Sequence, residues 1–279
     1  MNDLNKIAFI GGGNMARSII GGLVAQGVQS KCIVVKDTNP QTVDALLHDF
    51  GIQIARTNDE LLNQADVLVL AVKPQVMTHV CQDIAAKLDK NTLVISIAAG
   101  IDCCSLANWL GELTPLVRCM PNTPALLGKG ASGLFANEHT SAKQKQIADT
   151  MLSAVGITSW VDSEPLIDAV TAVSGSGPAY FFLLLEAMIE EGVRQGLPAE
   201  TSEALAKQTA LGAAQLALES DVPVAELRKR VTSPGGTTEK AILSFQENGF
   251  EALVGSAMQA CAARAQSLSL ELGASTTTD

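Results

Sequence analysis

The sequence of 279 residues predicts an α/β domain over residues 1–162 and an all-α domain over residues 163–279. Short apolar runs alternate with helical patterns as far as about residue 160, which is typical of a mostly parallel sheet with helices on both faces. A glycine-rich turn joins the first apolar run to the first helical pattern. The composition changes near Asp162-Ser163-Glu164-Pro165, and the chain beyond this point is helical in pattern.

The first strand and the first helix enclose the most informative turn of the chain. Ile7–Ile10 has the length of a buried strand, and Asn14–Gln26 carries apolar residues at helical spacing. The turn between them, Gly11-Gly12-Gly13-Asn14-Met15-Ala16, has the G-x-G-x-x-A spacing of a Rossmann dinucleotide-binding turn. Its first glycine permits the sharp bend, its second admits a pyrophosphate, and its small last residue packs the helix on the strand. The alternative is a glycine turn without a ligand, which the strand–turn–helix context disfavours.

The second predicted strand, Cys32–Lys36, ends directly before Asp37. An acidic residue about 20 positions beyond the glycine turn holds the 2′-hydroxyl of the adenosine ribose in many dinucleotide sites. We therefore expect Asp37 to belong to the cofactor site.

Further loops are expected at the same edge of the sheet, because the carboxyl ends of parallel strands meet there and form the ligand-binding edge. Strands are predicted at Val67–Val72, Leu93–Ile97, Leu116–Cys119, Ser132–Phe135 and Ile157–Val161, and helices include Pro40–Phe50 and Ser141–Val155. The loops are Ala71-Val72-Lys73-Pro74, Ala98-Ala99-Gly100 and Met120-Pro121-Asn122-Thr123-Pro124, and Asn58 begins a further helix. Each loop alone is compatible with an ordinary turn, whereas their convergence favours a nucleotide cleft. Lys73 would meet a phosphate or remain in solvent.

The second half predicts helices separated by breaks. They are Leu166–Val173, Ala179–Gln195, Ala199–Ser220, Val224–Val231, Thr237–Asn248 and Phe250–Leu272, with a break at Ser174-Gly175-Ser176-Gly177-Pro178. The segment 204–218 is rich in alanine, and small residues permit close helix packing. An apolar helical domain of this size is hard to cover alone, so we expect it to dimerise; the alternative is a self-contained bundle.

Composition excludes several classes of function. The net charge of −10 and the scarcity of Lys/Arg clusters argue against nucleic-acid binding. The opening residues lack a signal-peptide pattern, and no apolar run in the sequence approaches the length of a membrane span, so a cytoplasmic location is expected. The six cysteines show no C-x-x-C spacing and are expected to be reduced, and the three scattered histidines suggest no metal site.

A second glycine turn, Ser233-Pro234-Gly235-Gly236-Thr237-Thr238-Glu239, opens a helix in the second domain. The first N–H groups of that helix are suited to bind an anion, here a carboxylate, although a threonine could instead cap the helix. Apart from Cys261, the last 95 residues contain no His, Cys or Tyr to protonate a developing alkoxide. A protonated imine needs no such donor, so the pattern favours an imine substrate.

These motifs together resemble the pyrroline-5-carboxylate reductase family. The resemblance covers nearly the whole chain and rests on the glycine turn, on 71–74 and 96–100, on Arg118–Pro124, on Val173–Tyr180, and above all on Val231-Thr232-Ser233-Pro234-Gly235-Gly236-Thr237-Thr238. It implies a Rossmann domain followed by a helical dimerisation domain, with homodimers often assembled into a decamer. It also implies hydride transfer from NADP(H) or NAD(H) to C5 of 1-pyrroline-5-carboxylate, a small imino acid, which gives L-proline.

The resemblance also implies roles for individual residues. Residues 11–16, Asn58, 71–74 and 98–100 would hold the cofactor. Gly236, Thr237 and Thr238 would hold the substrate carboxylate through backbone N–H groups, and the Thr238 hydroxyl would orient the ring nitrogen as the catalytic group. Glu164 matches a position near the substrate, or equally a helix N-terminal acid.

Two questions stay open at this point. Many members of the family have a small hydroxyl residue where this chain has Asp37, and prefer NADPH. A carboxylate favours NADH, unless Asp37 turns away and Thr38 and Asn39 serve a 2′-phosphate. One competing function is a β-hydroxyacid dehydrogenase, which needs a catalytic lysine that the helix 179–195 lacks. The other is a non-catalytic NAD(P) sensor, which would have no need of the substrate-binding turn at 233–238.

Overall fold

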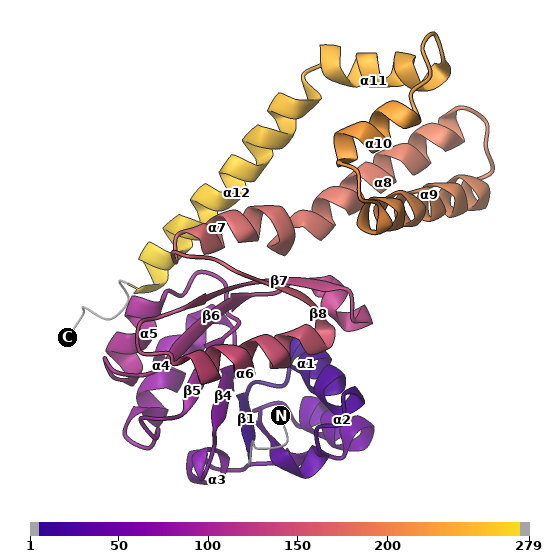
Figure 1. Cartoon of the computed structure of the whole chain (residues 1–279). Coiled ribbons are helices and arrows are strands. Elements are labelled where there is room, and N and C mark those ends of the chain that lie inside the picture. Colours follow the sequence, from indigo (N-terminus) through magenta and orange to yellow (C-terminus); the bar gives the residue numbers. More distant parts are fainter. Residues whose placement is uncertain (1–5, 274–279) are drawn as a thin grey trace. The chain divides into compact units, whose positions relative to one another are not determined.

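The computed structural model describes residues 6–273, so that residues 1–5, on which the expectation of no signal peptide partly rests, lie outside the described part (Figure 1). The chain forms two compact units. One combines the residues up to Ser176 with those from Cys261 onward, and the other is Gly177–Ala260.

The first unit contains one eight-stranded sheet in the order β3-β2-β1-β4-β5-β6-β7-β8. Its strands are β1 (Ile7–Ile10), β2 (Ile33–Lys36), β3 (Gln53–Ile54), β4 (Val67–Leu70), β5 (Leu93–Ser96), β6 (Leu116–Met120), β7 (Gly130–Ala136) and β8 (Gly156–Trp160). All neighbours pair in parallel except β6 and β7, so the predicted mostly parallel sheet is confirmed. The short β3 escaped sequence analysis because two residues are too few to show a period.

Helices cover both faces of this sheet. They are α1 (Asn14–Ala25), α2 (Pro40–Phe50), α3 (Asn58–Leu62), α4 (Pro74–Ala85), α5 (Cys103–Leu110) and α6 (Ala142–Leu152). Side chains of α1, α2 and α6 share one buried cluster with alternate residues of the strands, and side chains of α3, α4 and α5 share a second cluster with the residues between them. Because successive strand residues point to opposite faces, strands buried on both faces need the continuous apolar runs seen in the sequence.

The predicted break at 174–178 is wrong in part. After α7 (Leu166–Val170) the chain continues as a π-helical turn, Thr171–Gly175, and α8 begins at Gly177. The Ser176 N–H donates to the Thr171 carbonyl at 2.8 Å, the five-residue spacing of a π-turn. A Cβ at Gly175 would lie 2.6 Å from Met120 Cε, so packing on the first unit also requires the glycine here.

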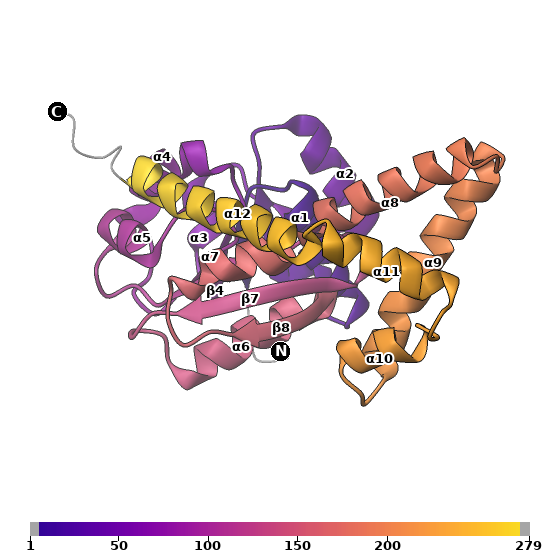
Figure 2. The same cartoon turned by 90° about the horizontal axis from the view of Figure 1, so that it is seen from above.

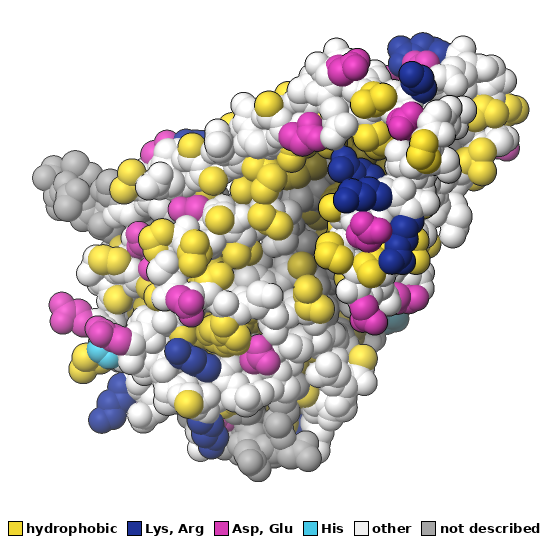
Figure 3. Space-filling view, turned by 45° about the horizontal axis from the view of Figure 1, so that its top comes forward, with side chains coloured by type: hydrophobic (Ala, Val, Ile, Leu, Met, Phe, Trp, Pro, Cys, Tyr) yellow, Lys and Arg dark blue, Asp and Glu magenta, His cyan; other side chains and the backbone are white. Residues whose placement is uncertain are grey.

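The second unit contains most of the remaining helices, and few of its side chains are buried. The bounds are α8 (Gly177–Arg194), α9 (Ala199–Glu219), α10 (Val224–Arg230), α11 (Thr237–Glu247) and α12 (Phe250–Gly273), the last of which extends into the first unit. Phe181, Phe182 and Leu183 are 66%, 65% and 67% exposed. Hydrophobic side chains, yellow in Figure 3, also reach the surface on the face drawn there.

Within residues 6–273, the helical run Leu166–Arg194 is the one stretch long and apolar enough to cross a membrane by length and composition. Only 11% of its most apolar window is buried inside the chain. The same test is passed by helices of soluble proteins, so this observation is weak evidence for a membrane span.

Candidate functional site

Four loops converge at the carboxyl edge of the parallel strands. The Gly11 N–H donates to the Lys36 carbonyl at 2.9 Å, which joins the loop after β1 to the end of β2. The Ala71 N–H donates to the Ile10 carbonyl at 2.8 Å, and the Ile97 N–H to the Leu70 carbonyl at 3.2 Å. The loops that follow β1, β2, β4 and β5 are therefore neighbours along one edge of the sheet, as sequence analysis predicted for the glycine turn, 71–74 and 98–100.

Each of the three positions in the first loop has a glycine for a different structural reason. Gly11 has φ +94°, and a Cβ there would lie 2.5 Å from the Ala71 carbonyl oxygen. A Cβ at Gly12 would lie 2.6 Å from Leu46 Cδ1 of α2. At Gly13 a Cβ would meet no atom within 4 Å, so the fold itself does not require this glycine. The open space beside Gly13 is what the close approach of a pyrophosphate requires.

The first turn of α1 provides the donors for such a ligand. Gly13 is the N-cap and makes no side-chain capping bond, and the first turn contains no acidic residue. The leading N–H groups of a helix have no partner inside the helix, and the helix dipole places partial positive charge on them. The residues present therefore fit the diphosphate of a dinucleotide.

Asp37 lies directly beside this loop. Its Oδ2 accepts the Gly12 N–H at 2.6 Å, and its Oδ1 accepts the Asn39 N–H at 2.7 Å. Asn39 in turn caps α2, because its Oδ1 accepts the Gln41 N–H at 3.0 Å. The Asp37 carboxylate is thus fixed by one bond to the glycine loop and one bond to the turn before α2.

The other residues predicted to hold the cofactor are placed as follows. Lys36 Nζ donates to Asn58 Oδ1 at 2.6 Å, which links the end of β2 to the start of α3. Lys73 is exposed and is the N-cap of α4, whose first residue is Pro74. Ala71 and Val72, which precede it, are half-buried.

The loop 98–100 is covered by the end of the C-terminal helix, a contact that sequence analysis did not predict. A Cβ at Gly100, which has φ +71°, would lie 3.0 Å from Leu268 Cβ of α12. Leu272 packs against the cluster that contains Ala98. The last turns of α12, yellow in Figures 1 and 2, thus pack against the loop 98–100.

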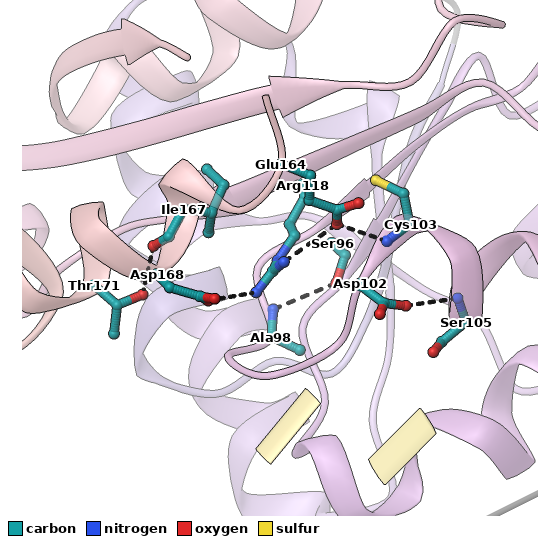
Figure 4. Close-up of polar contacts among 10 residues, drawn as sticks. All are labelled: Ser96, Ala98, Asp102, Cys103, Ser105, Arg118, Glu164, Ile167, Asp168 and Thr171. Carbon is teal, nitrogen blue, oxygen red and sulfur yellow. Dashed lines mark hydrogen bonds and ion pairs between the residues drawn. The ribbon is translucent and has the colours of Figure 1, made fainter. Parts of the chain in front are cut away.

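A buried charge cluster lies behind this loop (Figure 4). The Arg118 side chain on β6 is 5% exposed, and its Nη1 lies 3.2 Å from Glu164 Oε1. Its Nη2 lies 3.6 Å from Asp168 Oδ1. The same Oε1 of Glu164 accepts the N–H of Cys103, the first residue of α5, at 2.7 Å. Glu164 is therefore a helix N-terminal acid as well as the partner of a buried arginine.

Asp168 is the least satisfied member of this cluster. Its Oδ1 is buried and has no hydrogen-bond partner among the described residues. Burial raises the pKa of Asp168, and the repulsion of Asp102 adds to this effect, while the attraction of Arg118 opposes it. Sequence analysis missed Arg118 and Asp168 as a pair, since they are 50 residues apart; the one available signal was an arginine inside a predicted buried strand.

The second predicted turn lies in the second unit. Gly236 is the N-cap of α11, so Thr237 and Thr238 are its first two residues and do not cap it; no side-chain capping bond is made. The Gly236 N–H donates to the Ser233 carbonyl at 3.0 Å, and the Gly235 N–H to Glu239 Oε2 at 2.8 Å. The leading amides of α11 beyond Gly236 are consequently the ones oriented to meet an anion.

Comparison with known proteins identifies the family of this chain. Residues 6–100 match the family model described as NADP oxidoreductase coenzyme F420-dependent, and residues 164–268 match the model described as pyrroline-5-carboxylate reductase dimerisation. A pyrroline-5-carboxylate reductase of Pseudomonas aeruginosa is 57% identical over 268 residues, which are 96% of this chain and 98% of the relative. The chain belongs to the pyrroline-5-carboxylate reductase family.

Solved structures of pyrroline-5-carboxylate reductases agree with this assignment. One from Coxiella burnetii has a TM-score of 0.91 at 43% identity and covers 96% of this chain and 99% of its own. A pyrroline carboxylate reductase from Plasmodium falciparum with NADP bound has a TM-score of 0.85 at 29% identity, with coverage of 96% and 99%. The predicted Rossmann domain followed by a helical dimerisation domain is thus confirmed for this pyrroline-5-carboxylate reductase family member.

Proposed function

We propose that this chain catalyses the NAD(P)H-dependent reduction of 1-pyrroline-5-carboxylate to L-proline, the final step of proline biosynthesis. The observation that carries the proposal is the identity of 57% to a pyrroline-5-carboxylate reductase over 96% of the chain. The two matching family models include the glycine turn after β1 and the turn before α11 respectively.

The cofactor would be held by the loops of the first unit. Backbone N–H groups at the start of α1 would bind the diphosphate beside Gly13, where a side chain is absent. Asp37 would face the adenosine ribose, and the loops 71–74 and 98–100, with Asn58, would complete the cleft. Lys73, being exposed at the N-cap of α4, is suited to neutralise phosphate charge.

The substrate would be held by the start of α11. Thr237 and Thr238 would donate backbone N–H groups to the carboxylate, with Gly236 keeping the turn open. The Thr238 hydroxyl would hydrogen-bond the ring nitrogen and so fix the face of the imine. The family resemblance would place Glu164 near the substrate, and its Oε1 accepts from Arg118 Nη1 at 3.2 Å.

The chemistry demands little acid–base catalysis from the chain. The cofactor, when bound, would supply a hydride to C5 of the protonated imine, and the π electrons of the C=N bond would become the lone pair of the amine nitrogen. Thr238 holds that nitrogen in place during the change. Orientation of a planar imine against the cofactor, with water excluded, would therefore supply much of the rate.

Support for assembly comes from the second unit. We propose a homodimer whose subunits cover the exposed apolar side chains of α8, consistent with the dimerisation model over residues 164–268. The proposal includes assembly of the dimers into a decamer and a cytoplasmic location. It also places the boundary between the cofactor-binding domain and the dimerisation and substrate domain between residues 162 and 163. Analytical ultracentrifugation and cell fractionation test the first two of these.

The decisive experiment measures oxidation of NADPH and, separately, NADH with 1-pyrroline-5-carboxylate. Turnover with either cofactor and formation of L-proline support the proposal, and binding of both without turnover refutes it in favour of a sensor. Thr238→Ala should lower turnover while cofactor affinity is retained, because the two sites are built from different loops. Thr201→Ala, an exposed position on α9, is the matched control and should leave turnover unchanged.

A further inference from the structure

The orientation of the Asp37 side chain bears on which dinucleotide the cofactor site accepts. We infer that its fixed carboxylate selects NADH over NADPH, so that the 2′-position of the adenosine ribose must carry a free hydroxyl. This inference rests on the proposed function, since it concerns the same cofactor cleft.

The position of the carboxylate is the first part of the argument. Its Oδ2 accepts the N–H of Gly12 at 2.6 Å, and Gly12 belongs to the loop that approaches the diphosphate. A carboxylate that contacts this loop stands where the ribose next to the diphosphate must lie. Each of its oxygens has two lone pairs, so each can accept a ribose hydroxyl in addition to its backbone N–H.

The second part is that this carboxylate cannot easily turn away. Its Oδ1 also accepts the Asn39 N–H at 2.7 Å, so rotation would break two charge-assisted hydrogen bonds. Each such bond corresponds to about a tenfold or larger change in an equilibrium constant. Asn39 is itself positioned as the cap of α2, because its Oδ1 accepts the Gln41 N–H at 3.0 Å.

The third part concerns charge. A 2′-phosphate adds nearly two negative charges and has acceptor oxygens where the carboxylate needs a donor. The cations from the adjoining strand ends are Lys36 and Arg56. Lys36 Nζ donates to Asn58 Oδ1 at 2.6 Å, so this ammonium group is already engaged by the first residue of α3. The relative from Plasmodium falciparum has NADP bound, so preferred binding of the 2′-phosphorylated cofactor is the alternative that the experiment must test.

The experiment measures binding without turnover. Isothermal titration calorimetry of the full-length protein compares ADP-ribose with 2′-phospho-ADP-ribose, which differ only in the 2′ group. We expect ADP-ribose to bind on the order of 10- to 100-fold more tightly. Asp37→Ser should reduce that ratio at least about tenfold, and Asp37→Asn, which keeps the shape without the charge, should give an intermediate ratio.

Asp44→Asn on α2 is the matched control, because it removes the same charge from an exposed position of the helix that follows Asp37 and should leave the ratio unchanged. Equal or tighter binding of the 2′-phospho ligand by the wild-type chain overturns the inference and leaves the reductase function intact. An unchanged ratio in Asp37→Ser, with the variant shown to be folded by circular dichroism, also overturns it. Failure of both ligands to bind refutes the cofactor site itself, and with it the proposed function.

Discussion

Replacement of Arg118 by methionine tests the buried charge cluster. Methionine has a similar length, so the change removes the guanidinium while filling most of its space. The Arg118 side chain is 5% exposed, and its partners Glu164 and Asp168 are 20% and 19% exposed. Removing one member of a buried ion pair costs about 3–5 kcal/mol. Because both carboxylates keep some contact with solvent, we expect a loss of about 3 kcal/mol at neutral pH.

The pH dependence of this loss gives the sharper test. Burial raises the pKa of Asp168 in the wild-type chain although Arg118 opposes the shift, so the pKa must rise further in Arg118→Met. A carboxyl whose folded pKa exceeds its unfolded pKa makes the fold less stable as pH rises through that interval. The variant should therefore regain part of its stability as the pH falls from about 7 to about 5.

Urea unfolding followed by circular dichroism, at one fixed protein concentration, measures both effects. Adding Glu164→Gln and Asp168→Asn to Arg118→Met should restore most of the stability at neutral pH, since no unpaired charge is left. Arg264→Met, which breaks an exposed ion pair with Glu271 on α12, is the control and should change little. A loss below about 1 kcal/mol for Arg118→Met, or a loss that does not shrink on acidification, would refute the reasoning.

Three further predictions follow from particular contacts. Gly13→Ala should leave the free energy of unfolding nearly unchanged but weaken dinucleotide binding at least about tenfold, as calorimetry would show. Gly11→Ala should instead lower the free energy of unfolding by about 1–3 kcal/mol, as urea unfolding would show. Ser141→Ala removes the capping box of α6 and should cost about 1 kcal/mol in thermal unfolding, with no change in cofactor affinity. Burial raises the pKa of the Cys81 thiol to about 12, so a thiol reagent near neutral pH should label the exposed Cys104 and not Cys81, as peptide mapping would show.

Local sequence signals predicted much of the fold. The bounds of α2 at Pro40–Phe50 agree with those predicted, since a proline at its first turn and a following glycine mark both ends. The strand Ile7–Ile10 and the start of α1 at Asn14 likewise agree. Most other strand and helix limits differ by one or two residues. The predicted break before α8 was misjudged, because glycine and serine also occur in a π-turn whose close packing needs a small residue.

In the candidate site, too, some features could be predicted from local sequence and others could not. The positions of the glycine loop and of Asp37 beside it could be predicted, because residue types at fixed spacing mark one strand–turn–helix unit and the strand after it. The direction of the Asp37 carboxylate could not, since it depends on hydrogen bonds to Gly12 and Asn39 that form only when two loops meet.

The sequence by itself determined the order of strands and helices, the nucleotide turn and the family, because these depend on local periodicity and on motifs of contiguous residues. Only the tertiary structure decided that Arg118 is held by two carboxylates from a distant segment, and that α12 returns to cover Gly100. It also decided that Gly13, unlike Gly11, is free of steric demand from the fold. The physical reason is that burial, ion pairing and close approach depend on distances between residues remote in sequence, which local patterns do not encode.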